Sequence, residues 1–273
     1  MSEIAPALFL AHGSPLAALA DDAWSRQLRA CGARIRAAFP RLRAVVVVSA
    51  HWQSAGDDGE LAVGSAAHPE TIHDFGGFPQ ELFRLRYPAP GAPAISREVL
   101  EQLITQGVPA ILDPGRGLDH GCWVPLRQLL PAADLAVVPV ALPPHLDTAS
   151  LGALGRALGV MRQRDCLVIG SGAIVHNLRA VSPNLGDATP EPWALAFETA
   201  VVAAVAADDP AALLDGRLPE AARAAPTLEH LAPLPVVMYA RLPGDRVQTI
   251  TSLYHHRTLA MRSFAFSTRE LAA

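Results

Sequence analysis

Two short aliphatic runs, each followed by a histidine, constrain the fold of this chain more than any other feature. The run at residues 7–10 leads to His12, and the run at residues 43–49 leads to His51. Runs of β-branched and aliphatic residues without polar alternation are typical of strands buried on both faces, as in a parallel sheet. Functional sites of open α/β sheets lie beyond the carboxyl ends of the strands, so both imidazoles are expected at one site. Because neutral imidazole is the commonest metal ligand, the two runs predict a metal site.

Further strand and helix patterns alternate along the chain. This alternation predicts an α/β fold with a mainly parallel central sheet flanked by helices. Pro139 predicts that its own strand lies at an edge of the sheet or ends early. The expected strands are 7–10, 43–49, 136–140, 166–170, 246–251 and 261–266, and the expected helices are 20–38, 96–106, 124–130, 148–164 and 192–207.

Two segments, 56–93 and 183–192, carry the Gly and Pro residues of loops, but neither is a convincing linker. A chain of 273 residues, 51% of them hydrophobic, can bury a sizeable core, so residues 1–273 are interpreted as a single domain. Three cysteines are too few and too scattered for a disulfide framework, and each is interpreted as a small core residue in a reducing compartment. They are Cys31, Cys122 and Cys166.

Composition excludes several classes of function. All 22 basic residues are arginines, which excludes Schiff-base chemistry, pyridoxal phosphate attachment and the P-loop lysine. The net charge of −4 and the absence of a strong basic cluster argue against nucleic acid as a partner. No apolar run approaches the roughly 20 residues that span a bilayer, and no secretory signal is visible, so a cytoplasmic protein without a membrane partner is expected. The oligomeric state stays open, a homo-oligomer included.

Five of the ten histidines lie in contexts that suggest function. His12 and His51 follow strands, and His176 follows the strand at 166–170, so all three share one edge of the sheet. His120 lies between Asp119, which could orient its ring, and a glycine that permits close backbone approach. His230 follows a segment in which Thr227 could cap a short helix. Each could instead be a hydrogen-bonded structural residue.

The other histidines are interpreted as surface or loop residues. The adjacent pair His255-His256 cannot point to the same side of a regular element, and His145 follows two prolines. His68 and His73 lie in the long loop. The Gly and aromatic residues of 73–79 suit a pocket wall or a lid, and the segment 68–79 is expected to wall the pocket.

Other catalytic motifs are weaker. The segment 170–172, Gly-Ser-Gly, lacks the spacers of the G-x-S-x-G nucleophile elbow. Ser14 after a strand could suggest a serine hydrolase, but no Asp–His pairing except Asp119-His120 supports it. The H-E-x-x-H, Walker and Rossmann patterns are absent from the sequence.

Taken together, these motifs resemble the class III extradiol ring-cleavage dioxygenases of the LigB-like superfamily, and within them the bacterial and plant 4,5-DOPA dioxygenase group. The matching stretches run in family order over most of the chain. They are LFLAHGSP at 8–15, VVVSAHW at 46–52, IHDFGGFP at 72–79, YPAPG at 87–91, LDHGCW at 118–123, GSG at 170–172, VHNLR at 175–179 and EH at 229–230.

The resemblance implies the roles of the residues and the reaction. His12, His51 and His230 look like the metal ligands, and His176 like a catalytic base that can serve as a fourth ligand. His120 is similar to a histidine that contacts substrate or oxygen. The implied activity is extradiol cleavage of a catechol-type, DOPA-like diol by O2, with Fe(II) for activity and Zn(II) plausible in the isolated protein. A zinc-dependent hydrolase and a non-enzymatic, Memo-like metal-binding protein are the alternatives.

If His12, His51 and His230 bind one ion, their nitrogens cannot lie much more than about 4 Å apart, because imidazole–metal distances are roughly 2.0–2.1 Å. A separation of about 6 Å or more would contradict the site.

Overall fold

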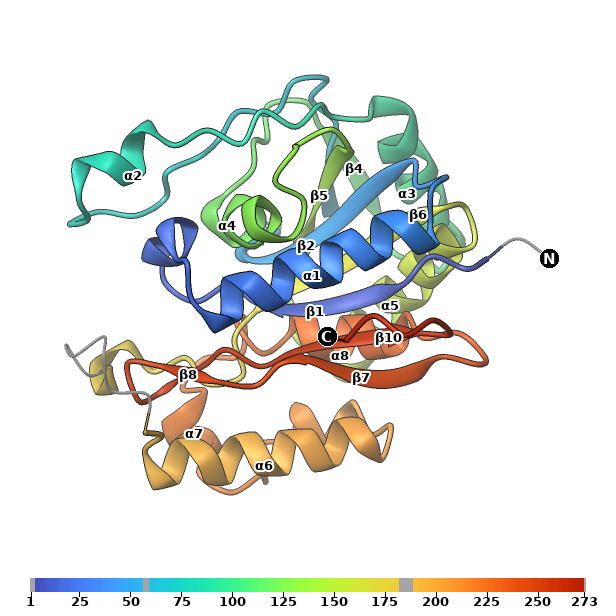
Figure 1. Cartoon of the computed structure of the whole chain (residues 1–273). Helices are drawn as coiled ribbons and strands as arrows, with labels where there is room; N and C mark the ends of the chain where they lie inside the picture. Colours follow the sequence, from blue (N-terminus) through green and yellow to red (C-terminus); the bar gives the residue numbers. More distant parts are fainter. Residues whose placement is uncertain (1–2, 56–58, 182–188, 273) are drawn as a thin grey trace.

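An eight-stranded sheet forms the centre of the molecule (Figure 1). The computed structural model describes residues 3–55, 59–181 and 189–272. The strands of this sheet are β1 (Ala7–Ala11), β2 (Ala44–Gln53), β3 (Leu61–Gly64), β4 (Ala110–Asp113), β5 (Ala136–Leu142), β6 (Cys166–Gly172), β7 (Arg246–Thr251) and β10 (Ser263–Ser267), and a separate hairpin consists of β8 (Tyr254–His255) and β9 (Leu259–Ala260). The spatial order is β4-β3-β5-β2-β6-β1-β10-β7. In it β5, β2, β6 and β1 are parallel neighbours, and the pairs β3–β5, β1–β10 and β10–β7 are antiparallel.

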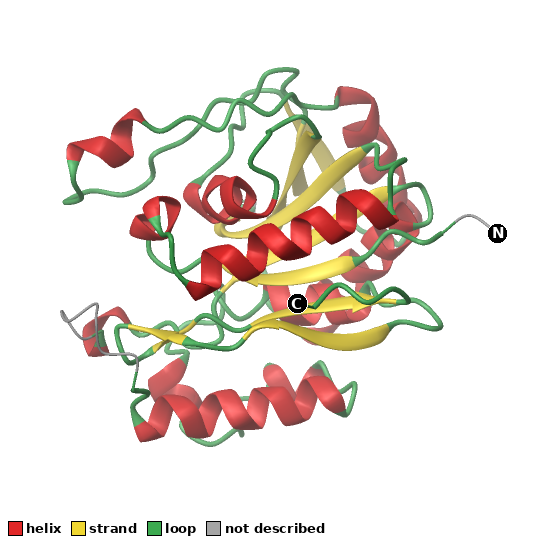
Figure 2. Cartoon of the chain, viewed as in Figure 1, coloured by secondary structure: helices red, strands yellow, loops and turns green. Residues whose placement is uncertain are grey.

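Helices cover both faces of this sheet, which confirms the predicted α/β class (Figures 1 and 2). One face packs against α1 (Ala23–Ala38) and α4 (His120–Leu129). The other packs against α3 (Pro93–Thr105), α5 (Thr148–Arg162), α6 (Pro192–Ala206), α7 (Ala221–Ala224) and α8 (Pro233–Tyr239). The short helix α2 (Gln80–Arg84) and the 3-10 turns Pro15–Leu19, Leu178–Ala180 and Ala211–Leu213 complete the described elements. Within the described ranges, no helix is long and apolar enough to cross a membrane.

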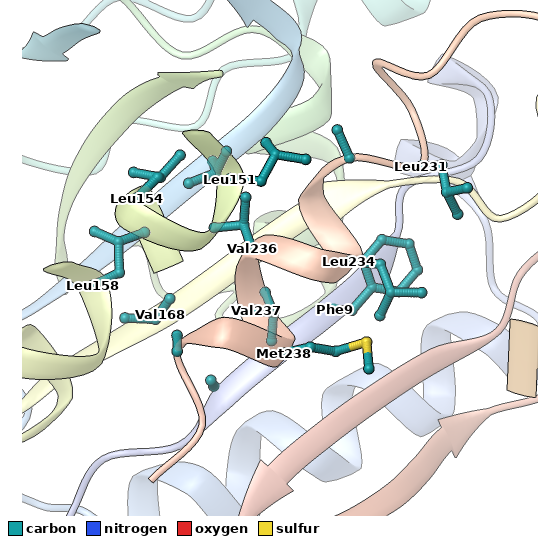
Figure 3. Packing of buried hydrophobic residues seen from close by; sticks show 14 of the residues in the cluster. Phe9, Leu151, Leu154, Leu158, Val168, Leu231, Leu234, Val236, Val237 and Met238 are labelled. Atoms are coloured by element: carbon teal, nitrogen blue, oxygen red, sulfur yellow. The ribbon is translucent and has the colours of Figure 1, made fainter. Parts of the chain in front are cut away.

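The aliphatic strands are buried on both faces, as their lack of alternation predicts. Leu8 and Leu10 belong to the apolar cluster on the α1 side, together with Trp24. Ala7 and Phe9 belong to the opposite cluster. Figure 3 shows the apolar side chains of α8 packed among those of α5 and of the strands in that second cluster.

Local sequence signals explain where the helices begin. Asp22 and Ser25 form a reciprocal capping box, with each side chain hydrogen-bonded to the other residue's backbone N–H at 2.9 Å. Asp119 and Asp147 cap α4 and α5 through one carboxylate oxygen each, which accepts from the backbone N–H three residues later. As expected, Pro192 opens its helix, where a missing N–H has no intrahelical partner to lose.

Several expectations about elements were wrong. Pro139 lies in an interior strand that continues to Leu142, between β3 and β2. The strand tolerates proline because β5 pairs with β3 only at Val63–Val140, and because Gly64 leaves room: a Cβ there would lie 2.5 Å from Pro139 Cγ. The segment 56–93 contains β3 and α2 rather than loop alone, and much of the expected loop at 183–192 lies outside the described residues.

A buried ion pair joins the C-terminal strands to the rest of the sheet. Arg162, at the end of α5, is fully buried, and its guanidinium donates to both carboxylate oxygens of Asp245 at 2.6 and 2.9 Å. Its remaining N–H groups donate to the carbonyls of Ala5, Ala240 and Phe266. All five donors of the guanidinium are therefore used, so the pair is fully satisfied.

Replacing Asp245 with Asn should lower the free energy of unfolding by about 3–5 kcal/mol, because it leaves the Arg162 charge buried without a counter-ion. The control is Asp208→Asn, which removes an exposed partner of Arg241 and should cost less than about 1 kcal/mol. Urea unfolding of both variants measures the difference. Equal effects of the two substitutions would contradict a special role for the buried pair.

Candidate metal centre

Three histidines converge beyond the carboxyl end of β6. This strand lies between β1 and β2, so His12 and His51 approach each other across it. His51 Nε2 lies 3.2 Å from His12 Nε2 and 3.3 Å from His230 Nε2, and one nitrogen from each ring lies within 4.8 Å of the others. Two of the three separations lie within the expected limit of about 4 Å, and all are below the roughly 6 Å that would contradict the site. His51 lies inside β2, which runs to Gln53, rather than past the end of its strand.

The hydrogen bonds of Ser171 define the proton position on His12. The Ser171 hydroxyl donates its single proton to the carbonyl of Gly121. Its oxygen must then accept from His12 Nδ1–H, which lies 3.0 Å away. With the proton on Nδ1, the Nε2 atom of His12 presents a lone pair to the two other rings.

The carboxylate of Glu229 fixes the proton of His230 on Nδ1, as Ser171 does for His12. Glu229 Oε1 accepts from His230 Nδ1–H at 3.0 Å and from the Thr227 hydroxyl at 2.8 Å. The hydrogen bond from His230 is the main favourable cause that lowers the pKa of Glu229 to about 2, against the opposing effect of burial. Thr227 therefore holds Glu229 and does not cap a helix as the sequence suggested; His230 lies in a turn before α8.

The rings of His12 and His51 are neutral. Burial lowers the pKa of His12 well below its ordinary value, and the neighbouring His51 lowers it further. Burial, followed by the charges of His120 and His230, lowers the pKa of His51 to about 2. His12 and His230, each with its Nδ1–H hydrogen-bonded, direct their Nε2 lone pairs towards Nε2 of His51, an arrangement that a cation stabilises. The donor set therefore fits a divalent ion that accepts nitrogen ligands.

The Gly-Ser-Gly segment that ends β6 has a structural role. Side chains alternate across a strand, so Ser171 faces His12 while Gly170 and Gly172 face the opposite side. A methyl group on Gly172 would clash with the carbonyl oxygen of His230, and one on Gly170 with that of Pro233. The glycines thus allow the turn that carries His230 to lie directly on the strand backbone, where the Ala173 N–H donates to the His230 carbonyl at 2.8 Å.

His120 is oriented by a residue other than the one expected. Asp119 is fully engaged with Ser49 Oγ, the Cys122 N–H and Arg116. Asp74 instead contacts His120: its Oδ1 accepts from the His120 backbone N–H at 2.9 Å and lies 3.0 Å from His120 Nδ1. The other oxygen of Asp74 lies 3.6 Å from His51 Nδ1. Asp74 therefore connects two of the histidines, a role that its position in the long loop did not reveal.

His176 stacks on His230. Their ring centroids are 3.3 Å apart and the rings are nearly parallel, at 8°. Burial and the neighbouring His230 lower the pKa of His176 to about 4, so its ring is neutral near pH 7 and can accept a proton. His176 groups with Glu229 and His230 rather than with His12 and His51.

A cavity of about 290 Å³ opens onto these histidines. Asp74, Phe75 and Phe78 line it, so part of the 68–79 loop walls the cavity as expected, whereas His68 and Pro69 lie along a different hollow. Leu259, Ala260 and Met261 also line the cavity, although no local signal in the sequence marked them. These residues lie in β9 and directly after it, in the β8–β9 hairpin, which is distant in sequence from the histidine motifs.

The remaining histidines lie apart from the cavity lining. His255 Nε2 is 2.9 Å from Asp22 Oδ2, and His145 is an exposed loop residue. His73 Nε2 lies 3.1 Å from the Leu85 carbonyl, and its ring packs against Phe83 and other aromatic residues. All three cysteines are free and buried, as expected of core residues.

Comparison with known proteins identifies the class. The family described as the catalytic LigB subunit of aromatic ring-opening dioxygenase matches residues 6–267. A 4,5-DOPA dioxygenase extradiol of Escherichia coli (strain K12) is 41% identical over 199 residues, covering 72% of this chain and 69% of that protein. A protein of the same name from Portulaca grandiflora is 34% identical over 278 residues, covering 95% and 94%. The crystal structure of an uncharacterized protein from Escherichia coli K12 matches with a TM-score of 0.78 and 30% identity, covering 96% of this chain and 99% of that one.

The chain belongs to the LigB family of aromatic ring-opening dioxygenases. It is an extradiol ring-opening enzyme, an oxidoreductase of a metal-dependent class that acts on an aromatic substrate with O2. The resemblance inferred from the motifs is confirmed, and an enzyme is favoured over the non-enzymatic alternative.

Replacing Gly172 with Ala should weaken binding of Zn(II), used as a probe, by roughly 10–100-fold, because the new methyl group displaces the turn that carries His230. The control is Gly152→Ala in α5, where the atom closest to the added methyl is the flexible end of Arg156 at 3.1 Å and the Tyr239 ring lies at an ordinary contact distance of 3.6 Å. Chelator competition gives the affinities of both variants. Wild-type affinity in Gly172→Ala would show that this contact does not position His230.

Proposed function

We propose that the chain is a single-domain, Fe(II)-dependent extradiol dioxygenase that opens the ring of a catechol-type substrate and incorporates both atoms of O2 to give a semialdehyde. The observation that carries this proposal is the convergence of three Nε2 atoms with at least two of their Nδ1 groups already hydrogen-bonded to protein. One sheet contains strands from both ends of the chain, from β1 at Ala7 to β10 at Ser267, and this supports a single domain. The free, buried cysteines support the cytoplasmic location expected from the sequence.

In this proposal His12, His51 and His230 hold the metal. When bound, Fe(II) would acidify a diol hydroxyl as a Lewis acid and couple oxidation of the ring to reduction of O2. Three neutral imidazoles leave the dipositive charge uncompensated, which favours a substrate that binds through two anionic oxygens. Imidazole also suits Zn(II), which has no redox chemistry, so zinc can occupy the same site without supporting ring cleavage.

His176 is the proposed base. It lines the cavity, is neutral at pH 7 and is fixed in orientation by its stack on His230. These properties suit it to take a proton from the diol, and its lone pair could alternatively serve as a fourth ligand when the cavity is empty of substrate. His120, held by Asp74, is proposed to contact the substrate or oxygen.

Loading the full chain anaerobically with Fe(II) should give oxygen-dependent ring cleavage of a simple catechol, whereas the same protein loaded with Zn(II) should be inactive. Metal content is determined on the samples used for the assay. Activity with Zn(II) but not with Fe(II) would contradict the proposal and favour the hydrolase alternative.

Two substitutions separate ligand from base. His51→Ala should lose the metal, whereas His176→Ala should retain most of it and lose roughly 10²–10⁴-fold in kcat. Metal content and turnover are measured on the same preparations. A metal-free His176→Ala protein would show that His176 is chiefly a ligand, and a fully active one would move the base elsewhere, with His120 the next candidate.

A further inference from the structure

The β8–β9 hairpin forms one wall of the cavity at the proposed metal site. Residues 259–261 line the cavity. The side chain of Met261 is buried against Gly13, which follows His12 in the chain: a Cβ on Gly13 would lie 2.7 Å from Met261 Cε. The position of the hairpin therefore determines where a bound ring meets this wall beside the histidines.

The hairpin is too short to hold its own position. Its strands have two residues each, and they pair at Tyr254–Ala260 and His255–Leu259. An isolated two-stranded hairpin is at best marginally stable in water. Contacts with the rest of the chain must therefore fix its position.

A buried carboxylate of α6 contacts the hairpin on both sides of the wall. Glu198 is the single charged residue in the sequence of α6, yet it is only 2% exposed. Its Oε2 accepts from the Tyr254 hydroxyl at 2.5 Å, and its Oε1 accepts from Arg262 Nε at 2.7 Å. Tyr254 pairs with Ala260 across the hairpin. Arg262 directly follows Met261, so the two partners of one carboxylate flank the residues that line the cavity.

Burial makes this contact more demanding than the others that reach the hairpin. A buried carboxylate is costly unless it keeps its hydrogen-bond and charge partners, so Glu198 strongly favours the arrangement in which both are in place. Burial, followed by the hydrogen bond to Glu198, raises the pKa of Tyr254, so its hydroxyl stays protonated and donates near pH 7. Two further contacts come from the partly exposed carboxylates of Asp22 and Glu191, where water weakens ion pairs.

We propose that Glu198 is a positioning residue for substrate binding, which holds residues 259–261 through Tyr254 and Arg262 as the wall against which the substrate ring packs. This proposal rests on the proposed ring-cleavage function. Glu198 does not itself line the cavity and lies outside the motifs that resemble the family, so it acts through the hairpin. Contacts with this wall are the same before and during the reaction, so loosening the wall should raise KM and leave kcat unchanged.

Three variants separate positioning from stability. Glu198→Gln keeps the size of the side chain but removes its charge, and Tyr254→Phe removes one of the two hydrogen bonds while keeping the ring. The control is Val205→Ala, about two turns further along α6, which leaves a cavity at a buried position and lowers the urea midpoint of unfolding without altering the hydrogen bonds of Glu198. Tyr254→Phe decides the question alone if Glu198→Gln does not fold.

Binding of 4-nitrocatechol to the Zn(II)-loaded proteins, followed by absorbance, gives a readout without turnover. Both hairpin variants should raise the dissociation constant roughly 4–16-fold, which corresponds to one or two methylene-sized contacts at about fourfold each. They should also speed hydrogen exchange of the amides in 252–262. Affinity for Zn(II) should stay unchanged, because His12 keeps its hydrogen bond to Ser171. With Fe(II), KM for the same catechol should rise by the same factor while kcat stays within about twofold.

Three results would overturn the proposal. Unchanged dissociation constants in both hairpin variants would show that the wall does not depend on Glu198, and an equal increase in Val205→Ala would show that only stability matters. Weaker Zn(II) binding in the hairpin variants would show that the effect passes through the histidines. Wild-type protein that binds no catechol would instead contradict the proposed function itself, and the positioning role with it.

Discussion

The first turn of α4 rests on the carboxyl ends of β2 and β6, and the geometry of the proposed metal centre depends on this contact. The carbonyl of Gly121 accepts from Ser171, whose oxygen accepts from His12. The cap residue of the same turn, Asp119, accepts from Ser49 of β2 at 2.6 Å. Because Gly121 has no side chain, this turn can lie against His51: a Cβ there would be 2.9 Å from His51 Cδ2. The first turn of α4 thus positions His12 through Ser171 and His51 through Gly121, and it carries His120 itself.

The opposite side of β6 is equally close-packed. Gly170 and Gly172 permit the turn before α8 to lie on the strand backbone, and that turn carries His230. The proposed metal centre is therefore built around the end of β6. The Ser171 hydroxyl lies on one side of this strand, and the backbone of Gly170 and Gly172, which carries no side chain, lies on the other. Since the side chains of a strand alternate, only a small–polar–small sequence at this strand end satisfies both neighbours.

Charge is arranged in shells around the site. The imidazoles lie at the centre, and carboxylates lie behind them: Glu229 behind His230, and Asp74 beside His120 and His51. These carboxylates orient ring nitrogens and would add negative charge near a dication bound by the histidines. Apart from the histidines, Asp74 and Ser14, the side chains that line the cavity are apolar.

Local sequence determined the strands at 7–10 and 43–49, the neighbouring histidines and the α/β class. Burial on both faces requires uninterrupted aliphatic residues, and this requirement is visible in a short window. The family motifs determined His120, His176 and His230 as candidates, since spacing alone left them undecided. The prediction for Pro139 was wrong because an interior strand tolerates a proline where it pairs little with its neighbour. The limited pairing of β5 with β3 cannot be read from the sequence of β5.

Tertiary structure alone decided how these residues act on one another. It placed β6 between β1 and β2, which brings His12 and His51 together and sets Ser171, 159 residues away in the chain, against His12. It assigned Asp74 rather than the adjacent Asp119 to His120, because adjacent residues on a helix cap point in different directions while a distant loop can reach the ring. Tautomers, pKa values and the charge of a cavity wall depend on partners distant in sequence, so only the folded chain defines them.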